Sequence, residues 1–330
     1  MWLILKLLRF GLYFILAVVV VGGVLFAYFV YTPDSAVPTL AGTLTKDSID
    51  VGGLTRTYLS YVPDGLPKSA ALVLVLHGSG ESGVQIRRET GYGFDRLADR
   101  YHFAVIYPDA HRSAQGDWNA CGTVGDANAA KASVDDVTFL THLVEKRVAD
   151  LGADPHRVFA VGSSRGGFMA FRLALEAPSV FRAVAPVSAN VHTAENFKCR
   201  PSHDGTSSVL IMNGTKDPIV PFDGGTVSLL GFSYKYGRVM SSQDSARFFA
   251  NLNHLGGTPV TVETQLADGV SVNQATWKSA SNVEVELVAI EGGGHGMPQP
   301  YRRHPRLLGP SLNEPNGPEV IWAFFERQRR

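Results

Sequence analysis

The distribution of apolar positions divides the chain into a long uncharged N-terminal stretch and a mixed remainder. Phe10–Tyr31 is 22 residues long and carries no charge, and it is preceded by Lys6 and Arg9. As a helix it would extend about 33 Å, enough to cross a hydrocarbon core of about 30 Å. It ends in aromatic residues rather than in a signal-peptidase site, and the preceding cations favour an N-terminus inside the cell. We therefore expect residues 1–31 to be a transmembrane anchor that leaves the rest outside the cytoplasm; a cleaved signal peptide of a secreted protein is the alternative.

Residues 32–41, which include two prolines, are expected to be a linker, and residues 42–330 a single large domain. Within the domain, Ala71–Leu76 is an unbroken apolar run, typical of a strand that is buried on both faces. Val134–Leu151 instead places its apolar residues on one helical stripe. The predicted strands are Gly42–Val51, Leu54–Pro63, Ala71–Leu76, Phe103–Tyr107, Arg157–Val161, Phe181–Val187, Ser208–Met212 and Val283–Ile290. The predicted helices are Gln85–Arg100, Val134–Leu151, Gly166–Glu176, Val239–Leu255 and Pro318–Arg327. Strands that alternate with helices predict an α/β fold with a mainly parallel central sheet covered on both faces.

Composition and charge narrow the possible partners. Lys and Arg together number 30, as do Asp and Glu, so the formal net charge is zero. No strong field points to nucleic acid, and no obligate protein partner is evident. The two cysteines, Cys121 and Cys199, are not in metal-ligand spacing, and neither a metal nor a cofactor is implied. Outside the cytoplasm these cysteines are expected to form a disulfide, with two unpaired thiols as the alternative.

One short motif stands between a predicted strand and a predicted helix. Val161–Met169 reads VGSSRGGFM and contains a G-x-S-x-G match centred on Ser164. Arg157–Val161 precedes the motif as a strand, and Gly166–Glu176 follows it as a helix. This strand–turn–helix context is that of a nucleophile elbow, in which a strained serine is exposed on a tight turn. A glycine- and serine-rich loop that fits the pattern by chance is the alternative, and the flanking elements favour catalysis.

A serine hydroxyl needs a general base, usually a histidine, which follows the serine in the chain order of α/β-hydrolases. His295 lies in the segment EGGGHGM, directly after the predicted strand Val283–Ile290. A loop at this place can extend over the sheet edge, and its glycines permit close approach of the backbone. We therefore predict His295 as the base. The other histidines after Ser164 lack such a placement: His192, His203, His254 and His304.

The base in turn needs a carboxylate that orients it. Asp217 follows the predicted strand Ser208–Met212 in the segment NGTKDPIVP, and Asp223 is its rival six residues later. Either aspartate fits ordinary turn chemistry as well. The chain order of serine, acid and histidine, each just beyond a strand, favours Asp217.

Acyl transfer also requires donors for the developing oxyanion. The backbone N–H of Arg165 is one candidate, because it directly follows the nucleophile. The second donor should come from the loop after Ala71–Leu76, where Ser79 is the choice. His77 in the same loop and Trp118 are candidates for the substrate pocket, although a tryptophan that packs over the core is an equal alternative for Trp118.

An ordered set of motifs resembles the polyhydroxybutyrate depolymerase/feruloyl esterase-like branch of the α/β-hydrolases. The motifs are Leu76-His77-Gly78, Trp118-Asn119, Val134-Asp135-Asp136-Val137, the GSSRGGFMA elbow, Asn213–Pro221 and Gly292-Gly293-Gly294-His295. The likeness extends from about Gly42 to the C-terminus. It implies the α/β-hydrolase fold and a secreted-type carboxylic ester hydrolase whose triad positions are Ser164, Asp217 and His295.

Two positions depart from the pattern of that branch. Arg165 stands where its members often have Ala or Asn, and Met297 stands near the place where an aromatic residue often follows the histidine. These departures bear on which ester is the substrate more than on the type of reaction.

The sequence thus predicts a membrane-tethered serine esterase that cleaves small or oligomeric carboxylic esters through an acyl-enzyme on Ser164. Two alternatives remain. One is a serine peptidase of the same fold, and the other is a catalytically silent binding domain on a membrane anchor.

Overall fold

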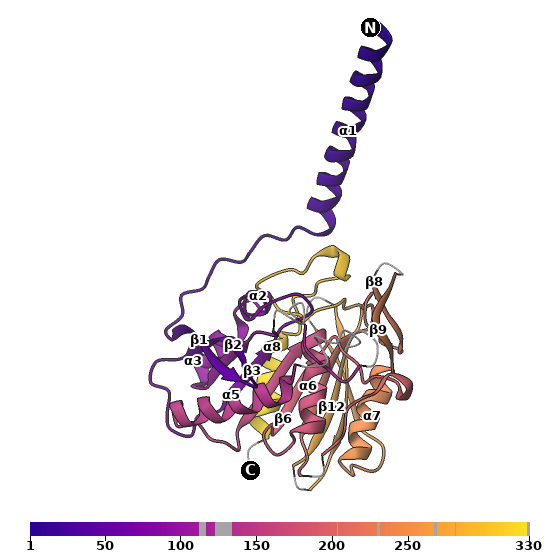
Figure 1. Ribbon diagram of the computed structural model, residues 1–330. Helices are drawn as coiled ribbons and strands as arrows, with labels where there is room; N and C mark the ends of the chain where they lie inside the picture. The colour runs from indigo at the N-terminus through magenta and orange to yellow at the C-terminus, as the bar shows by residue number, and fades with distance from the viewer. Residues whose placement is uncertain are drawn as a thin grey trace.

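A single mixed sheet forms the centre of the domain in the computed structural model of the protein (Figure 1). The structure describes residues 1–111, 117–122, 134–202, 204–229, 232–266, 269–280 and 282–328. The strands of this sheet are β1 (Thr43–Val51), β2 (Leu54–Val62), β3 (Leu72–Leu76), β4 (Ala104–Pro108), β5 (Val158–Ser163), β6 (Ala183–Val187), β7 (Ser208–Gly214), β10 (Val260–Gln265), β11 (Ser271–Lys278) and β12 (Glu284–Ile290). They lie in the order β1-β2-β4-β3-β5-β6-β7-β12-β11-β10. The strands from β4 to β12 run parallel to one another, and those at the two edges are antiparallel to their neighbours.

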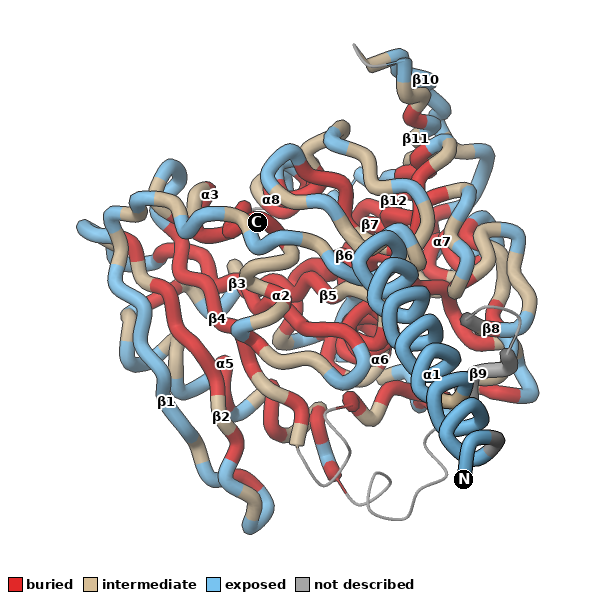
Figure 2. The backbone as a smooth tube through the Cα atoms, turned by 90° about the horizontal axis from the view of Figure 1, so that it is seen from above, coloured by how far each residue is buried: buried red, intermediate tan, exposed pale blue. Residues whose placement is uncertain are grey.

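The central strand β3 shows why helices cover both faces of the sheet. Side chains alternate between the two faces of a strand, so a strand that is apolar at every position needs cover on both. Leu72, Leu74 and Leu76 pack with the helices α5 (Asp136–Leu151), α6 (Arg165–Glu176) and α7 (Ser242–Leu252). Val73 and Val75 pack with α2 (Gly83–Glu89), α3 (Gly93–Tyr101) and α8 (Gly317–Arg327). The central strands are accordingly buried along most of their length (Figure 2). The predicted mainly parallel sheet with helices on both faces is confirmed.

The N-terminal helix α1 (Trp2–Phe29) stands apart from the domain (Figure 1). Its segment Ile4–Phe29 is long and apolar enough to cross a membrane, and the most apolar part of this segment is not buried against the domain. Figure 2 shows the helix exposed along its length. An exposed apolar surface of this size is unfavourable in water, which fits a segment that is solvated by lipid.

The predicted helix Gln85–Arg100 is in fact two helices, α2 and α3. Gly91 and Tyr92 interrupt it with left-handed backbone angles, φ 60° and 57°. The turn is tightly packed, because a Cβ on Gly91 would approach Gln299 to 2.6 Å. The interruption lets α2 and α3 pack in different directions against the same face of the sheet.

Strands that the apolar pattern did not predict lie in the second half of the chain. β8 (Gly225–Leu229) pairs with β9 (Phe232–Val239) in a separate hairpin, and β10 and β11 extend one edge of the main sheet. Every residue of β10 is exposed, so this strand has no apolar alternation to detect. Val239 ends β9, which is why the predicted helix Val239–Leu255 begins only at Ser242. Most of the stretch between the predicted strand Phe103–Tyr107 and the predicted helix Val134–Leu151 lies outside the described residues, as does His203.

Candidate active site

Ser164 occupies the tight turn between β5 and α6. Its backbone is left-handed, with φ 53° and ψ −116°. Glycine is required on both sides: a Cβ on Gly162 would overlap the carbonyl of Gly166, and a Cβ on Gly166 would overlap the carbonyl of Leu76. The G-x-S-x-G spacing is therefore the one that this turn needs. Ser164 lines a cavity of about 200 Å³ above the carboxyl ends of the parallel strands.

His295 and Asp217 lie on turns that follow two neighbouring parallel strands, β12 and β7. Nδ1 of His295 lies 2.8 Å from Oδ2 of Asp217. The other carboxylate oxygen of Asp217 accepts the N–H groups of Ile219 and Val220, at 2.8 and 2.9 Å. The Asp217 side chain is only 1% exposed, and that of His295 8%. A carboxylate with three such partners fixes the orientation of the imidazole.

The remaining candidates for acid and base lie elsewhere. Asp223 is exposed to solvent, whereas His295 lines the cavity together with Ser164. His192 is buried and lies beside Asn196, whose amide nitrogen is 3.0 Å from Nδ1. His254 follows the C-terminal end of α7 and does not line the cavity. The structure thus brings together the three residues that the chain order favoured.

The predicted oxyanion donors, Ser79 and Arg165, both line the cavity next to Ser164. Arg165 is the first residue of α6, where the helix end carries a partial positive charge. Its side chain is buried, and its Nε donates to the carbonyl of Trp118 at 2.8 Å. The unusual arginine of the elbow therefore braces the protein beneath the site.

His77 and Trp118 do not line the cavity. The pocket role predicted for His77 is therefore wrong, whereas Trp118 takes the alternative role of packing in the core. Both side chains are fully buried. Nε2 of His77 accepts the N–H of Ala110 at 3.0 Å, so Nδ1 carries the proton and donates to the carbonyl of Gly78 at 2.7 Å. Burial lowers the pKa of His77, which keeps the ring neutral. Trp118 donates its indole N–H to the carbonyl of His77 at 3.0 Å. The two side chains support the turn after β3 from below.

The cavity has walls that the sequence did not reveal. Five apolar side chains and three ionisable ones line it besides the predicted residues: Phe168, Ile219, Val220, Val227, Leu308, Glu81, Glu89 and His304. His304 belongs to a basic run that looks like surface, yet its Nε2 lies 2.9 Å from the carbonyl of Met297 and burial lowers its pKa. Val227 comes from β8, a strand that was not predicted. Phe168 lies in the elbow motif, and Ile219 and Val220 lie in Asn213–Pro221. No motif marks the other five side chains, which are placed by turns and tertiary contacts.

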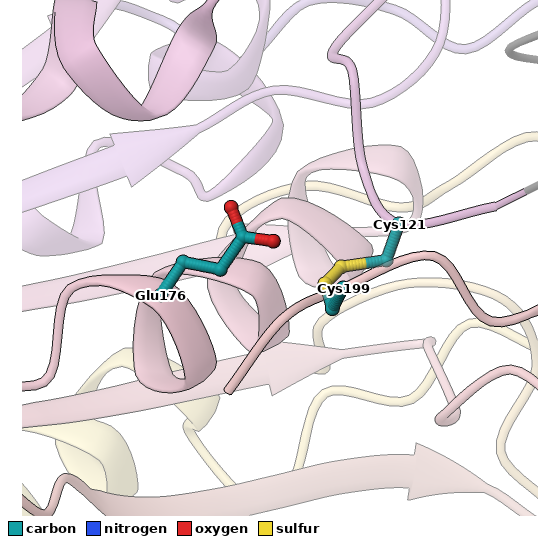
Figure 3. Close-up of side chains that lie close together, drawn as sticks. All are labelled: Cys121, Glu176 and Cys199. Atoms are coloured by element: carbon teal, nitrogen blue, oxygen red, sulfur yellow. A yellow bond between two sulfur atoms is a disulfide. The ribbon is translucent and has the colours of Figure 1, made fainter. Parts of the chain in front are cut away.

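Cys121 and Cys199, which are 78 positions apart in the sequence, are joined by a disulfide, with their Cα atoms 4.8 Å apart (Figure 3). Glu176 lies beside the pair, and its carboxylate accepts hydrogen bonds from Nε of Arg172 at 2.9 Å and from the N–H of Arg200 at 3.0 Å. Thiolates, not disulfide sulfurs, are the metal ligands of cysteine. With their sulfurs in a disulfide, the two cysteines are not available as metal ligands beside Glu176. The bond links the segment after Trp118 to the segment after β6.

The sheet order and the elbow are those of an α/β-hydrolase. An acetyl xylan esterase from Aspergillus awamori superposes with a TM-score of 0.56 at 16% identity, covering 77% of this chain and 94% of that one. Residues 56–228, more than half of the chain, match the family described as Esterase PHB depolymerase. The chain belongs to this family, as its motifs predicted.

Individual relatives agree with this assignment. NocK of Nocardia uniformis subsp. tsuyamanensis, which is named as an esterase, is 34% identical over 59% of this chain and 54% of its own length. Poly(3-hydroxyalkanoate) depolymerase C of Paucimonas lemoignei is 25% identical over 72% and 58%. Feruloyl esterase C of Emericella nidulans is 27% identical over 86% and 87%. The chain thus spans little more than half the length of the first two relatives.

Proposed function

We propose that the protein is a carboxylic ester hydrolase that works through an acyl-enzyme on Ser164. The observation that carries this proposal is that His295, which is paired with Asp217, lines the same cavity as a serine held in left-handed backbone geometry. These are the three roles that nucleophilic acyl transfer requires, namely nucleophile, base and orienting acid.

The reaction follows from the positions of these groups. His295 takes the proton of the Ser164 hydroxyl through Nε2 while the oxygen attacks the ester carbonyl carbon. The backbone N–H groups of Ser79 and Arg165 are proposed to donate to the oxyanion that forms. The intermediate collapses when His295 gives the proton to the departing alkoxide, which leaves as the alcohol. Water then repeats the sequence on the acyl-enzyme, and the acid is released while Ser164 regains its proton.

The size and lining of the cavity support a compact acyl group as substrate. A volume of about 200 Å³ is below the range of about 300–1,000 Å³ that is typical of pockets for drug-sized ligands. Its apolar side chains favour an uncharged hydrocarbon or aromatic acyl group. An oligomeric ester would place one acyl unit in the cavity and leave the remainder outside.

The juxtamembrane linker supports a site that faces the membrane. Asp34 pairs with Arg88 at 2.9 Å and with Arg302 at 3.3 Å. Arg306 lies 4.2 Å from the ring centre of Tyr28, near the end of α1. The segment with Arg302 and Arg306 also carries two cavity residues, His304 and Leu308. We propose that α1 anchors the protein, with its catalytic domain outside the cytoplasm and its cavity on the side toward the bilayer; secretion after cleavage is the second candidate.

A panel of substrates tests the function. The full chain in detergent should hydrolyse short p-nitrophenyl esters and leave a matched peptide p-nitroanilide intact, and a fluorophosphonate should label Ser164 alone. Cleavage of the amide at a comparable rate would indicate a peptidase of the same fold. Neither turnover nor labelling would indicate a silent binding domain. The anchor is tested by a carbonate wash, in which the protein should stay with membranes and retain Met1.

A further inference from the structure

Two carboxyl groups lie in the wall of the cavity that contains Ser164 and His295. Glu81 comes directly after the turn that follows β3, and Glu89 is the last residue of α2. Each is partly buried, and the two side chains are in hydrogen-bonding contact with one another. Neither takes part in the proposed acyl transfer, so their position in this wall requires another explanation.

Two carboxylates in contact repel each other strongly when they are removed from water, and such a pair keeps one proton. The cations that face the pair, Arg302 and Arg88, offset only part of that repulsion. Burial raises the pKa of both groups, and the charge of Glu81 helps to raise that of Glu89 to about 8. The proton therefore belongs to Glu89, whose O–H donates to the Glu81 carboxylate. His295 also faces Glu81, and it adds positive charge there only when its ring is protonated.

The charged member of the pair holds the backbone of the turn that carries Ser79. Oε2 of Glu81 accepts the N–H of Gly78 at 2.8 Å. The packing is close, because a Cβ on Gly78 would lie 3.1 Å from the same oxygen. His77 and Trp118 support the turn from the core side, and Glu81 supports it from the cavity side. The N–H of Gly78 is thereby engaged by Glu81.

We propose that Glu81 and Glu89 share one proton and act as positioning residues, which hold the turn His77–Gly80 in the conformation that the oxyanion requires. The inference rests on the proposed function. Loss of the shared proton leaves two facing carboxylates, which move apart, and Glu81 then releases Gly78. Because the proton is lost as the pH rises through about 8, kcat should fall on the alkaline side while KM changes little.

Isosteric substitutions separate this role from a structural one. Glu89→Gln supplies a permanent N–H donor to Glu81, so the alkaline fall in kcat should move upward by at least about one pH unit, with kcat near pH 6.5 within about twofold of wild type. Glu145→Gln, an exposed glutamate on α5, removes the same charge far from the cavity and should leave the profile unchanged. Glu81→Ala should lower kcat by about 10²-fold, and Glu81→Gln should restore most of it, because the amide oxygen still accepts the Gly78 N–H.

Carbon-13 NMR of labelled glutamate carboxyl groups observes the pair without turnover. Wild type should show two carboxyl signals that titrate together near pH 8, and Glu89→Gln should lack that step. An unshifted alkaline limb in Glu89→Gln, or full kcat in Glu81→Ala, would overturn the inference. Failure of the wild type to hydrolyse esters would overturn the proposed function instead, and the NMR titration would still decide whether the proton is shared.

Discussion

The two ionisable walls of the cavity are built on different principles. On one side, the Asp217 carboxylate accepts two backbone N–H groups and the imidazole of His295. On the other side, Glu81 accepts one backbone N–H among the described residues and is in hydrogen-bonding contact with Glu89. Both carboxyl groups are shielded from water, but only Asp217 accepts enough hydrogen bonds to stabilise a carboxylate without sharing a proton with a second acid.

This difference explains how two acids in the cavity wall and a third acid behind His295 coexist beside the same nucleophile. A carboxylate surrounded by donors serves as a fixed charge that orients a base. A carboxyl pair with one proton serves as a donor and an acceptor at once and depends on pH. The first arrangement follows from turns at adjacent strand ends, whereas the second follows from the packing of α2 against the turn after β3.

Removal of the nucleophile should have the largest effect, because both walls act through it. Ser164→Ala is expected to lower kcat for a p-nitrophenyl ester by about 10⁴-fold or more. The remaining rate enhancement is the part that the oxyanion donors and substrate binding supply. Fluorophosphonate labelling should disappear with it. Ser48→Ala, an exposed serine on β1, serves as the control and should keep both rate and label. An unaffected rate in Ser164→Ala would rule out the acyl-enzyme.

The wall with the fixed charge is tested by two matched aspartates in one loop. Asp217→Asn should lower kcat by about 10³- to 10⁴-fold with the fold intact, because the imidazole loses its orienting acceptor. Asp223→Asn removes an exposed carboxylate and should cost far less. Steady-state kinetics and circular dichroism of both variants decide the matter. Reversed losses would move the acid to Asp223 and leave the Ser164–His295 pair in place.

The strand-end residues were predictable from sequence because each follows a strand with a strong apolar signal. Ser164, Asp217 and His295 come directly after β5, β7 and β12, whose buried residues mark the strands. Parallel strands bring their carboxyl ends to one edge, so the three turns had to converge. The order along the chain then distinguished Asp217 from its rival.

The other wall was not predictable, because its positions depend on tertiary contacts. Nothing in the sequence distinguishes Glu81 and Glu89 from solvated glutamates, since their burial results from the break between α2 and α3 and from the segment with Arg302. His77 and Trp118 were misassigned for the same reason: proximity in sequence to the turn does not show on which side of it a ring lies. The edge strand β10 escaped detection because all of its residues are exposed.

The disulfide should matter for stability more than for chemistry. Replacing both Cys121 and Cys199 by serine removes a crosslink that spans 78 residues, and the free energy of unfolding is expected to fall by about 3–5 kcal/mol. Denaturant titration measures the loss, and alkylation of the unreduced, denatured wild type should modify no thiol. Two modified thiols would show that the cysteines are unpaired. Asp217 and His295 lie in other loops, so the remaining kcat should stay within about tenfold.

The smallest expected effect concerns the support beneath the turn and compares two buried tryptophans. Trp118→Phe deletes the indole N–H that donates to the His77 carbonyl, leaving a buried acceptor with one partner fewer. We expect a loss of about 1–2 kcal/mol in unfolding free energy and a fall in kcat of a few-fold at constant KM, because the turn carrying Ser79 loosens.

Trp322→Phe is the matched control: its indole N–H is buried with no acceptor among the described residues, and its ring stacks on Phe103 at 3.9 Å between centroids. That variant loses packing but no hydrogen bond, and it lies on the far side of the sheet from α6, so its kcat should be unchanged. Equal falls in kcat for the two variants would mean that general loosening of the core, and not the His77 contact, limits the turn.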